Sequence, residues 1–105
     1  MSCGPGPVIV ELPIEDINRP DVQEAGRHAI LEHNTKENDN LTFIHVVNGL
    51  APSFVTGVST YYILVIKATT ANGTLWTYVA NITKYFTIPS PSYHLNSFSD
   101  VIPYK

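Results

Sequence analysis

The sequence predicts one α+β domain, in which a single helix packs across an antiparallel sheet of four or five strands. In residues 21–34, apolar and small residues recur at steps of three and four, which is typical of one helix face. The segments that follow are rich in Val, Ile, Thr, Tyr and Phe, which favours strands. One helix followed by several strands fits an α+β arrangement. We expect residues 1–105 to form this one domain, with residues 1–7 flexible.

Composition excludes several classes of function. Hydrophobic residues make up 44% of the chain and charged residues only 14%, which is typical of a globular protein. The net charge is −3 and no Lys/Arg cluster is present, so we expect no nucleic-acid partner. No apolar run approaches the ~20 residues that a membrane-spanning helix needs. Cys3 is the only cysteine, which excludes an internal disulfide and a Cys-based zinc site; we expect no metal and no other cofactor.

The start of the chain leaves its compartment open. It lacks the basic-then-apolar pattern of a signal peptide. We expect a cytoplasmic protein if Met1 is native, and a secreted or vacuolar one if a signal peptide has been removed. Asn-x-Thr sequons at Asn40, Asn72 and Asn81 hint at a secreted history.

The predicted helix has a recognisable beginning and a stripe of small residues. Pro20 suits a first helical position, and Asp21 with Glu24 has the spacing of a capping box. Small side chains on one face would let the helix axis approach a sheet closely. This explains a glycine inside a helix, where it otherwise costs ~1 kcal/mol relative to alanine. The small residues are Ala25, Gly26 and Ala29.

Strands are predicted on both sides of the helix. Before it, Val8-Ile9-Val10 could form a short edge strand; after it, Asn72-Gly73 is a strong hairpin signal that predicts antiparallel neighbours. On one face of the segment that follows this turn, Ala80 would leave room for a crossing helix, and Trp76 is expected in the core. The predicted strands are residues 41–48, 57–69, 75–87 and roughly 95–102.

The order of these elements resembles the cystatins, and plant cystatins most closely. Plant cystatins carry a Leu-Ala-Arg-Phe-Ala-Val helix followed by Glu-His-Asn. The resemblance extends from about Val10 to Val101 and implies the cystatin fold. It is carried by Ala25-Gly26-Arg27-His28-Ala29-Ile30, Leu31-Glu32-His33-Asn34, Lys36-Glu37-Asn38 and Leu41-Thr42-Phe43.

The resemblance implies reversible inhibition of papain-like cysteine proteases. Cystatins use a three-part wedge made of a glycine-bearing N-terminal trunk, a Gln-x-Val-x-Gly hairpin and a Pro-Trp hairpin. It would explain why large apolar residues occupy the bend of APSFVTGVST, residues 51–60. Gly57 is expected to supply a positive φ there. The expected protease-binding residues of this hairpin are Ser53, Phe54, Val55, Thr56 and Gly57.

This sequence departs from the cystatin pattern in all three parts. Ser53 replaces the glutamine, and the trunk glycines would align near Ile9 and Val10. The Pro-Trp pair is absent, and the later loop offers Pro91 and Tyr93 as contacts instead. We therefore expect weaker binding than a complete wedge gives.

Two alternatives follow from those losses. The chain could be a non-inhibitory binding module, monomeric or a homodimer that exchanges hairpins. It could instead be a cofactor-free enzyme that moves protons on a small molecule in an isomerisation, cyclisation or elimination. Imidazole and phenol groups could then serve as base and hydrogen-bond donor. The catalytic candidates are His28, His45, His94 and Tyr93.

Overall fold

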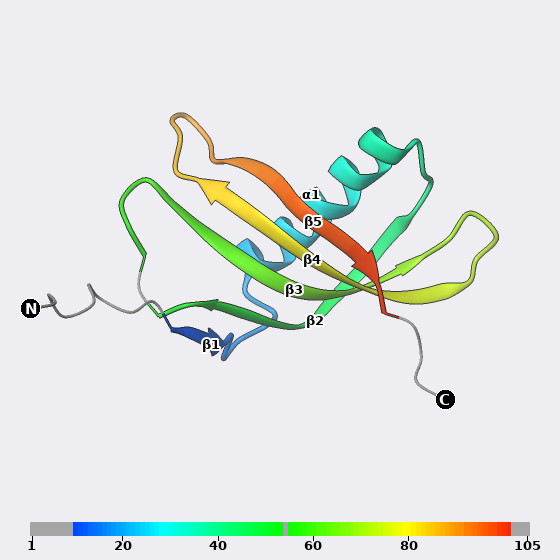
Figure 1. Cartoon of the computed structure of the whole chain (residues 1–105), viewed down its shortest axis with the longest axis horizontal. Helices are drawn as coiled ribbons and strands as arrows, with labels where there is room; N and C mark the ends of the chain where they lie inside the picture. The colour runs from blue at the N-terminus through cyan, green and yellow to red at the C-terminus, as the bar shows by residue number, and fades with distance from the viewer. Residues whose placement is uncertain (1–9, 54, 102–105) are drawn as a thin grey trace, which may run out of the picture.

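A computed structural model describes residues 10–53 and 55–101 and shows one helix lying across a five-stranded antiparallel sheet (Figure 1). This confirms the predicted α+β, cystatin-like fold. The strands follow one another in the order β1-β2-β3-β4-β5, so every neighbour in the sheet is also a neighbour in the chain. The elements are β1 (Glu11–Pro13), α1 (Pro20–Glu37), β2 (Thr42–Pro52), β3 (Ser59–Thr69), β4 (Leu75–Tyr85) and β5 (Ser92–Asp100).

The helix begins where predicted but is capped differently. Pro20 is at the start of α1, yet Arg19 holds the N-cap position and no side chain caps the helix there. The predicted capping box is therefore wrong, because Asp21 already lies inside the first turn. Its carboxylate accepts hydrogen bonds from the Arg19 guanidinium and the Tyr62 hydroxyl, both at 3.0 Å. The helix runs past residue 34 and ends where Asn38 takes a left-handed φ of 54°.

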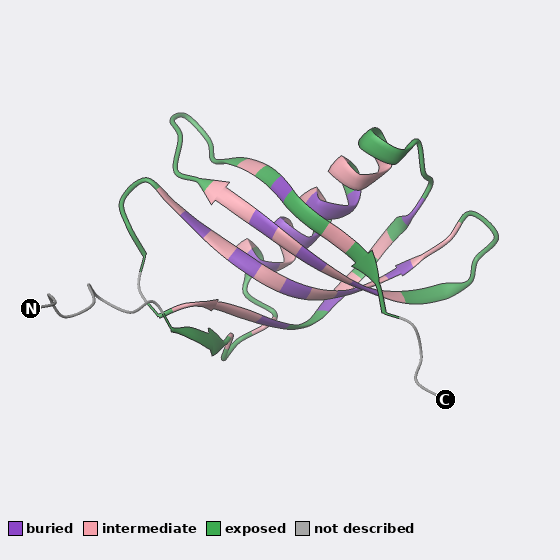
Figure 2. Cartoon of the chain, viewed as in Figure 1, coloured by how far each residue is buried: buried purple, intermediate pink, exposed green. Residues whose placement is uncertain are grey.

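The core lies between α1 and the concave face of the sheet. Buried residues alternate with more exposed ones along β3 and β4, as Figure 2 shows. Tyr78, Ala80 and Ile82 are buried on the face toward the helix, which confirms the prediction for Ala80, but Trp76 remains 37% exposed. The expectation of a core tryptophan was therefore wrong, because Trp76 lies on the sheet where buried packing ends. The largest fully buried side chains are Ile30, Leu64, Ile66, Ile82, Val22 and Val46.

The helix α1 approaches β2 closely at Gly26. A Cβ on Gly26 would overlap Val46 Cγ2 and would lie 3.2 Å from Phe43 Cε1. Beside it, the Gln23 amide accepts a hydrogen bond from the Val46 N–H at 2.9 Å and donates one to the Val46 carbonyl at 3.1 Å. These bonds lie at a register shift of β2, where strand pairing is irregular. Close packing and hydrogen bonds thus both fix the helix to the sheet at Val46.

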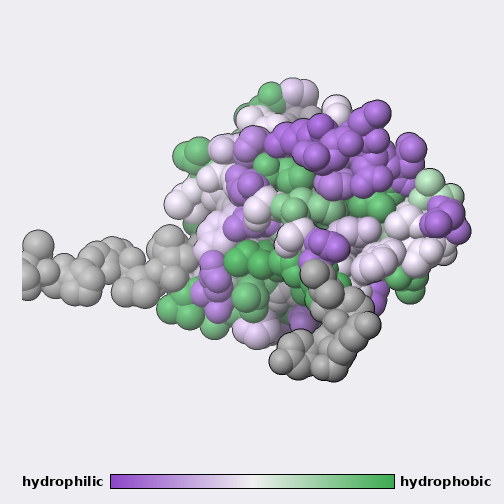
Figure 3. Space-filling view, turned by 45° about the vertical axis from the view of Figure 1, so that its right-hand side comes forward, coloured by the Kyte–Doolittle hydropathy of each residue, from purple (hydrophilic) through white to green (hydrophobic). Residues whose placement is uncertain are grey.

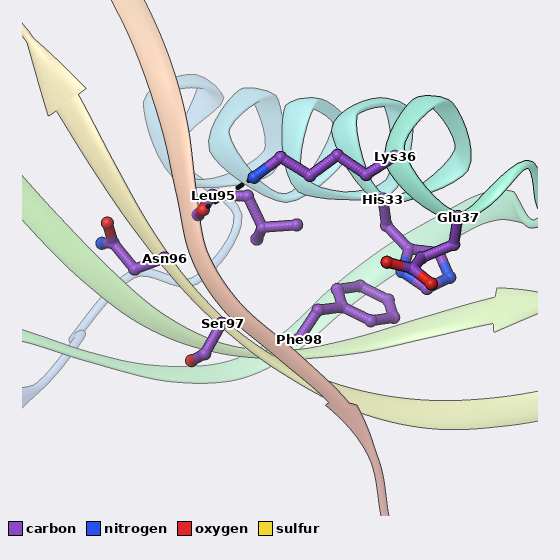
Figure 4. Close-up of a pocket in the computed structure, with 7 residues that line it drawn as sticks. All are labelled: His33, Lys36, Glu37, Leu95, Asn96, Ser97 and Phe98. Carbon is purple, nitrogen blue, oxygen red and sulfur yellow. Dashed lines mark hydrogen bonds between the residues drawn. The ribbon is translucent and has the colours of Figure 1, made fainter.

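The helix also covers part of the free edge of β5. Glu32 Oε1 accepts the Leu95 N–H at 3.1 Å. Lys36 Nζ donates to the Leu95 carbonyl at 3.4 Å (Figure 4). Glu32 and Lys36 pair with each other at 3.1 Å. Because an open edge strand is a template for pairing with another chain, these contacts protect the middle of β5.

The Gly26 contact predicts the effect of one added methyl group. We expect Gly26→Ala to lower the free energy of unfolding by about 1–2 kcal/mol, because overpacking outweighs the ~1 kcal/mol gain in helix propensity. Denaturant unfolding measures this. Adding Val46→Ala to Gly26→Ala should cost less than Val46→Ala costs alone, because the removed methyl group makes the room. Gly57→Ala is the control, since nothing lies within 4 Å of its Cβ position. Stabilisation by Gly26→Ala would contradict the packing account.

The Asp21 contacts predict a pH-dependent contribution to stability. Burial alone would raise the pKa of the Asp21 carboxyl, but hydrogen bonds from Arg19 and Tyr62 outweigh it and lower the pKa. A carboxyl whose folded pKa lies below its unfolded value stabilises the fold above that unfolded value. The contribution is lost as the pH falls through the folded pKa.

We therefore expect Asp21→Asn to lower the free energy of unfolding at pH 7 by on the order of 1 kcal/mol, a value kept small by partial exposure. The difference from the parent chain should vanish well below pH 3. Thermal unfolding at both pH values measures it, with exposed Glu15→Gln as the control. An equal difference at both pH values would contradict the assignment to the charged carboxylate.

Candidate functional site

Three segments meet at the end of the sheet that carries the β2–β3 and β4–β5 connections (Figure 1). The Ser53 N–H donates to the Val10 carbonyl at 2.7 Å, which places the start of the described chain beside the first connection. The Phe86 N–H donates to the Val58 carbonyl at 2.9 Å, which places the second connection beside the first. Backbone hydrogen bonds therefore hold the three segments together.

Apolar side chains are exposed on these three segments. Val58 is 71% exposed and Ile88 is 95% exposed, although both are large and hydrophobic. Neither residues 53–58 nor residues 86–91 contain a charged or histidine residue. Exposed apolar side chains that gather on one surface are typical of a contact surface for a partner. We name Val10, Val55, Val58, Phe86 and Ile88 the apolar edge.

Both connections are braced by their own side chains. Thr56 Oγ1 donates to the Ser59 carbonyl at 3.0 Å and accepts the Val58 and Ser59 N–H groups at 3.3 and 3.2 Å. Thr87 Oγ1 donates to the Ser90 carbonyl at 2.6 Å. A loop that is already ordered loses less conformational entropy when it binds.

The structure places most of the predicted first-hairpin residues at this end. Ser53, Val55 and Thr56 are exposed there, while Phe54 lies outside the described residues. Gly57 is exposed too, but the prediction that it needs a positive φ was wrong. The bend spans several residues, and the Thr56 hydroxyl braces it. Among the described glycines, only Gly73 has a positive φ, of 87°, in the turn predicted from Asn72-Gly73.

The predicted contacts of the second loop separate in the structure. Pro91 is exposed in the β4–β5 connection. Tyr93 is instead half-buried against the helix, with its ring stacked on His28 at 4.2 Å between centroids. The sequence reasoning missed Val58, Phe86 and Ile88. All three are large apolar residues beside Gly, Ser, Thr or Pro, but Val58 and Phe86 fell within the predicted strands 57–69 and 75–87, which hid the signal.

The proposed catalytic residues do not form one site. His28 and Tyr93 come together, and His28 Nε2 lies 3.1 Å from Glu24 Oε2. His94 is exposed on β5, and His45 lies on β2 opposite Lys67. Three open grooves of about 400–460 Å³ lie on the described surface, and none of these three is lined by His28, His45, His94 or Tyr93.

The described residues show neither a membrane-spanning nor a metal-binding feature. Within them, no helix is both long and apolar enough to cross a membrane. Three or more His, Cys, Asp or Glu side chains do not gather anywhere in this part of the chain in a way that could hold a metal ion.

Comparison with known proteins identifies the family. A family model described as aspartic acid proteinase inhibitor matches residues 14–101, whereas no curated protein matches the chain. This finding points to aspartic proteinases, so the prediction of a papain-like cysteine protease as target and partner was wrong. The small-molecule enzyme and the non-inhibitory module stay predictions that this comparison does not test. The fold is cystatin-like, but the wedge motifs on which the expectation of a cysteine protease depended are incomplete in this sequence. Because the match spans the helix and all strands except β1, the chain belongs to the aspartic acid proteinase inhibitor family.

Proposed function

We propose that this protein inhibits an aspartic proteinase by placing its apolar edge against the substrate cleft of the enzyme. The observation that carries this proposal is the gathering of exposed apolar side chains on two braced, uncharged connections. Membership of the inhibitor family supports the class of target. The helix and the sheet serve as the scaffold that holds the connections in place.

The chemistry of the edge suits an acidic environment. Aspartic proteinases use two neighbouring carboxyl groups that share one proton, and pepsin works in the acid range for this reason. Residues 53–58 and 86–91 contain no group that titrates in that range. Their attraction to an apolar cleft comes from buried area, about 25 cal/mol per Å², and not from charge. The two connections therefore keep the same chemistry at acidic and neutral pH.

The bracing of the connections also favours inhibition over cleavage. A proteinase cuts a segment that it can hold extended, with the scissile bond near the catalytic carboxyls. The Thr56 and Thr87 hydrogen bonds hold the two connections in turns and would have to break before either could extend. The edge can thus fill apolar subsites without presenting a well-placed peptide bond.

We further infer a relationship to plant cystatins within the cystatin-like fold. The support is the run from Ala25 to Asn34, which parallels the plant cystatin helix and its Glu-His-Asn ending. In this proposal the helix and the sheet are retained from plant cystatins, and the residues of the apolar edge account for the different target proteinase. An edge without glutamine and Pro-Trp, but with Val58 and Ile88 exposed, is consistent with such a change.

The proposed target class predicts a selective inhibitor. We expect the purified chain to inhibit porcine pepsin at about pH 3–4 with an inhibition constant below 1 μM, and to leave papain active at tenfold higher concentration. Residual activity on a fluorogenic peptide measures both. Absence of pepsin inhibition at 10 μM, with the chain shown to be folded at that pH, would reject pepsin-like enzymes as targets.

The proposed contact surface predicts which substitutions weaken inhibition. Val58→Arg and Ile88→Arg should each raise the inhibition constant for pepsin at least tenfold, about 1.4 kcal/mol, by burying a charge in an apolar cleft. Leu75→Arg is the matched control, because Leu75 is 55% exposed at the opposite end of the sheet. Melting temperatures should stay unchanged in all three. Equal loss in the control, or no loss in the edge variants, would refute the assignment.

A further inference from the structure

A second surface lies on the concave side of the sheet, remote from the apolar edge. It is a groove of about 450 Å³ in which aromatic side chains from α1, β4 and β5 meet two carboxylates. We call it the aromatic groove and define it by His33, Trp76, Tyr78, Phe98, Asp39 and Asp100.

The groove exists because the helix is shorter than the sheet that it covers. The helix ends at Glu37, while β3 and β4 continue to the turn at residues 70–74 (Figure 1). Beyond the helix end, Trp76 is 37% exposed, and Asp39 and Asp100 line an open groove. Figure 3 brings the right-hand end of Figure 1 forward and shows a band of hydrophilic surface above patches of hydrophobic surface. Trp76, the only tryptophan of the chain, lies in this region.

Stacked rings form the floor of the groove. The rings of His33 and Phe98 stack with centroids 4.0 Å apart, and the rings of Phe98 and Tyr78 with centroids 5.1 Å apart. Figure 4 shows His33 and Phe98 side by side beneath the helix end. Trp76 lies on the same strand face as Tyr78, two residues before it. Aromatic faces carry partial negative charge and attract cations, tryptophan most strongly.

Carboxylates add full negative charge to the same groove. Asp39 follows the helix end and Asp100 ends β5 directly opposite Tyr78. Burial raises the pKa of the Tyr78 phenol, and the charges of Asp39 and Asp100 raise it further, so both carboxylates act on the groove floor. No Lys or Arg is among the described residues that line it. His33 Nε2 lies 3.0 Å from Asp39 Oδ2. The Asp100 carboxylate faces the groove and has no corresponding imidazole contact among the described lining residues.

We propose that the aromatic groove binds an arginine side chain of a partner protein. A guanidinium group is planar and always charged, so it can lie on an aromatic face while its N–H groups donate to a carboxylate. Both kinds of contact are present here: the ring of Trp76, which is 37% exposed, and the carboxylates of Asp39 and Asp100. The groove lies at the opposite end of the sheet from the apolar edge, so a proteinase and a basic partner can be bound together. This inference concerns a separate surface and does not depend on the proposed inhibition.

The tryptophan makes the proposal directly testable. Triarginine amide added to the intact chain at pH 7 and low ionic strength should change Trp76 fluorescence in a saturable way. Triglycine amide should not. Raising the salt concentration from 20 to 300 mM should weaken binding severalfold, because the attraction is partly between exposed charges. Trilysine amide should bind more weakly, because an ammonium group cannot form the planar contact.

Charge-matched variants separate the groove from general acidity. Asp39→Asn with Asp100→Asn should weaken triarginine binding at least tenfold. Glu15→Gln with Asp16→Asn removes the same charge elsewhere and should leave binding unchanged. Both double variants should retain their inhibition of pepsin. If the fluorescence does not saturate, if both double variants bind alike, or if trilysine binds as tightly as triarginine, the assignment is overturned.

Discussion

The contact of Gly26 with Val46 is the constraint on which the rest of the structure depends. A helix that carried any side chain at this position could not lie so close to β2. The depth of the helix determines whether Gln23 reaches the Val46 backbone and whether Glu32 and Lys36 reach the edge of β5. A helix displaced outward by the width of one methyl group would lengthen all of these hydrogen bonds. Because protein cores are close-packed, such a displacement would disturb side-chain packing across the whole concave face.

This arrangement divides the molecule into a scaffold and two exposed ends. The helix stabilises the centre of the sheet, and the hairpin connections extend beyond it on both sides (Figure 1). At one end, exposed apolar side chains on braced connections form the apolar edge. At the other, the concave face beyond the helix end forms the aromatic groove. Substitutions at either end can therefore change binding with little effect on the free energy of unfolding, which suits a fold whose members differ in target.

Much of the fold was predictable from the sequence because its signals are local. The spacing of Ala25, Gly26 and Ala29 predicted the close helix, and Asn72-Gly73 predicted the β3–β4 turn; both are present. The wrong predictions concern side chains for which more than one environment was possible. Asp21 had the spacing of a capping residue, but Arg19 and Tyr62 bind it instead. Trp76 has the strand parity of the core, but it is the second residue of β4, before the buried positions of that strand begin, and it stays 37% exposed.

The site was less predictable, because it joins segments that are far apart in the chain. The first connection was found through its resemblance to a cystatin hairpin, whereas Val58, Phe86 and Ile88 become a common surface only through the Phe86–Val58 backbone bond. Hydrogen exchange of the chain bound to pepsin tests the central claim most directly. The account predicts protection on binding at residues 53–59 and 85–91 and no change in α1. Protection confined to α1 or to the aromatic groove would contradict it.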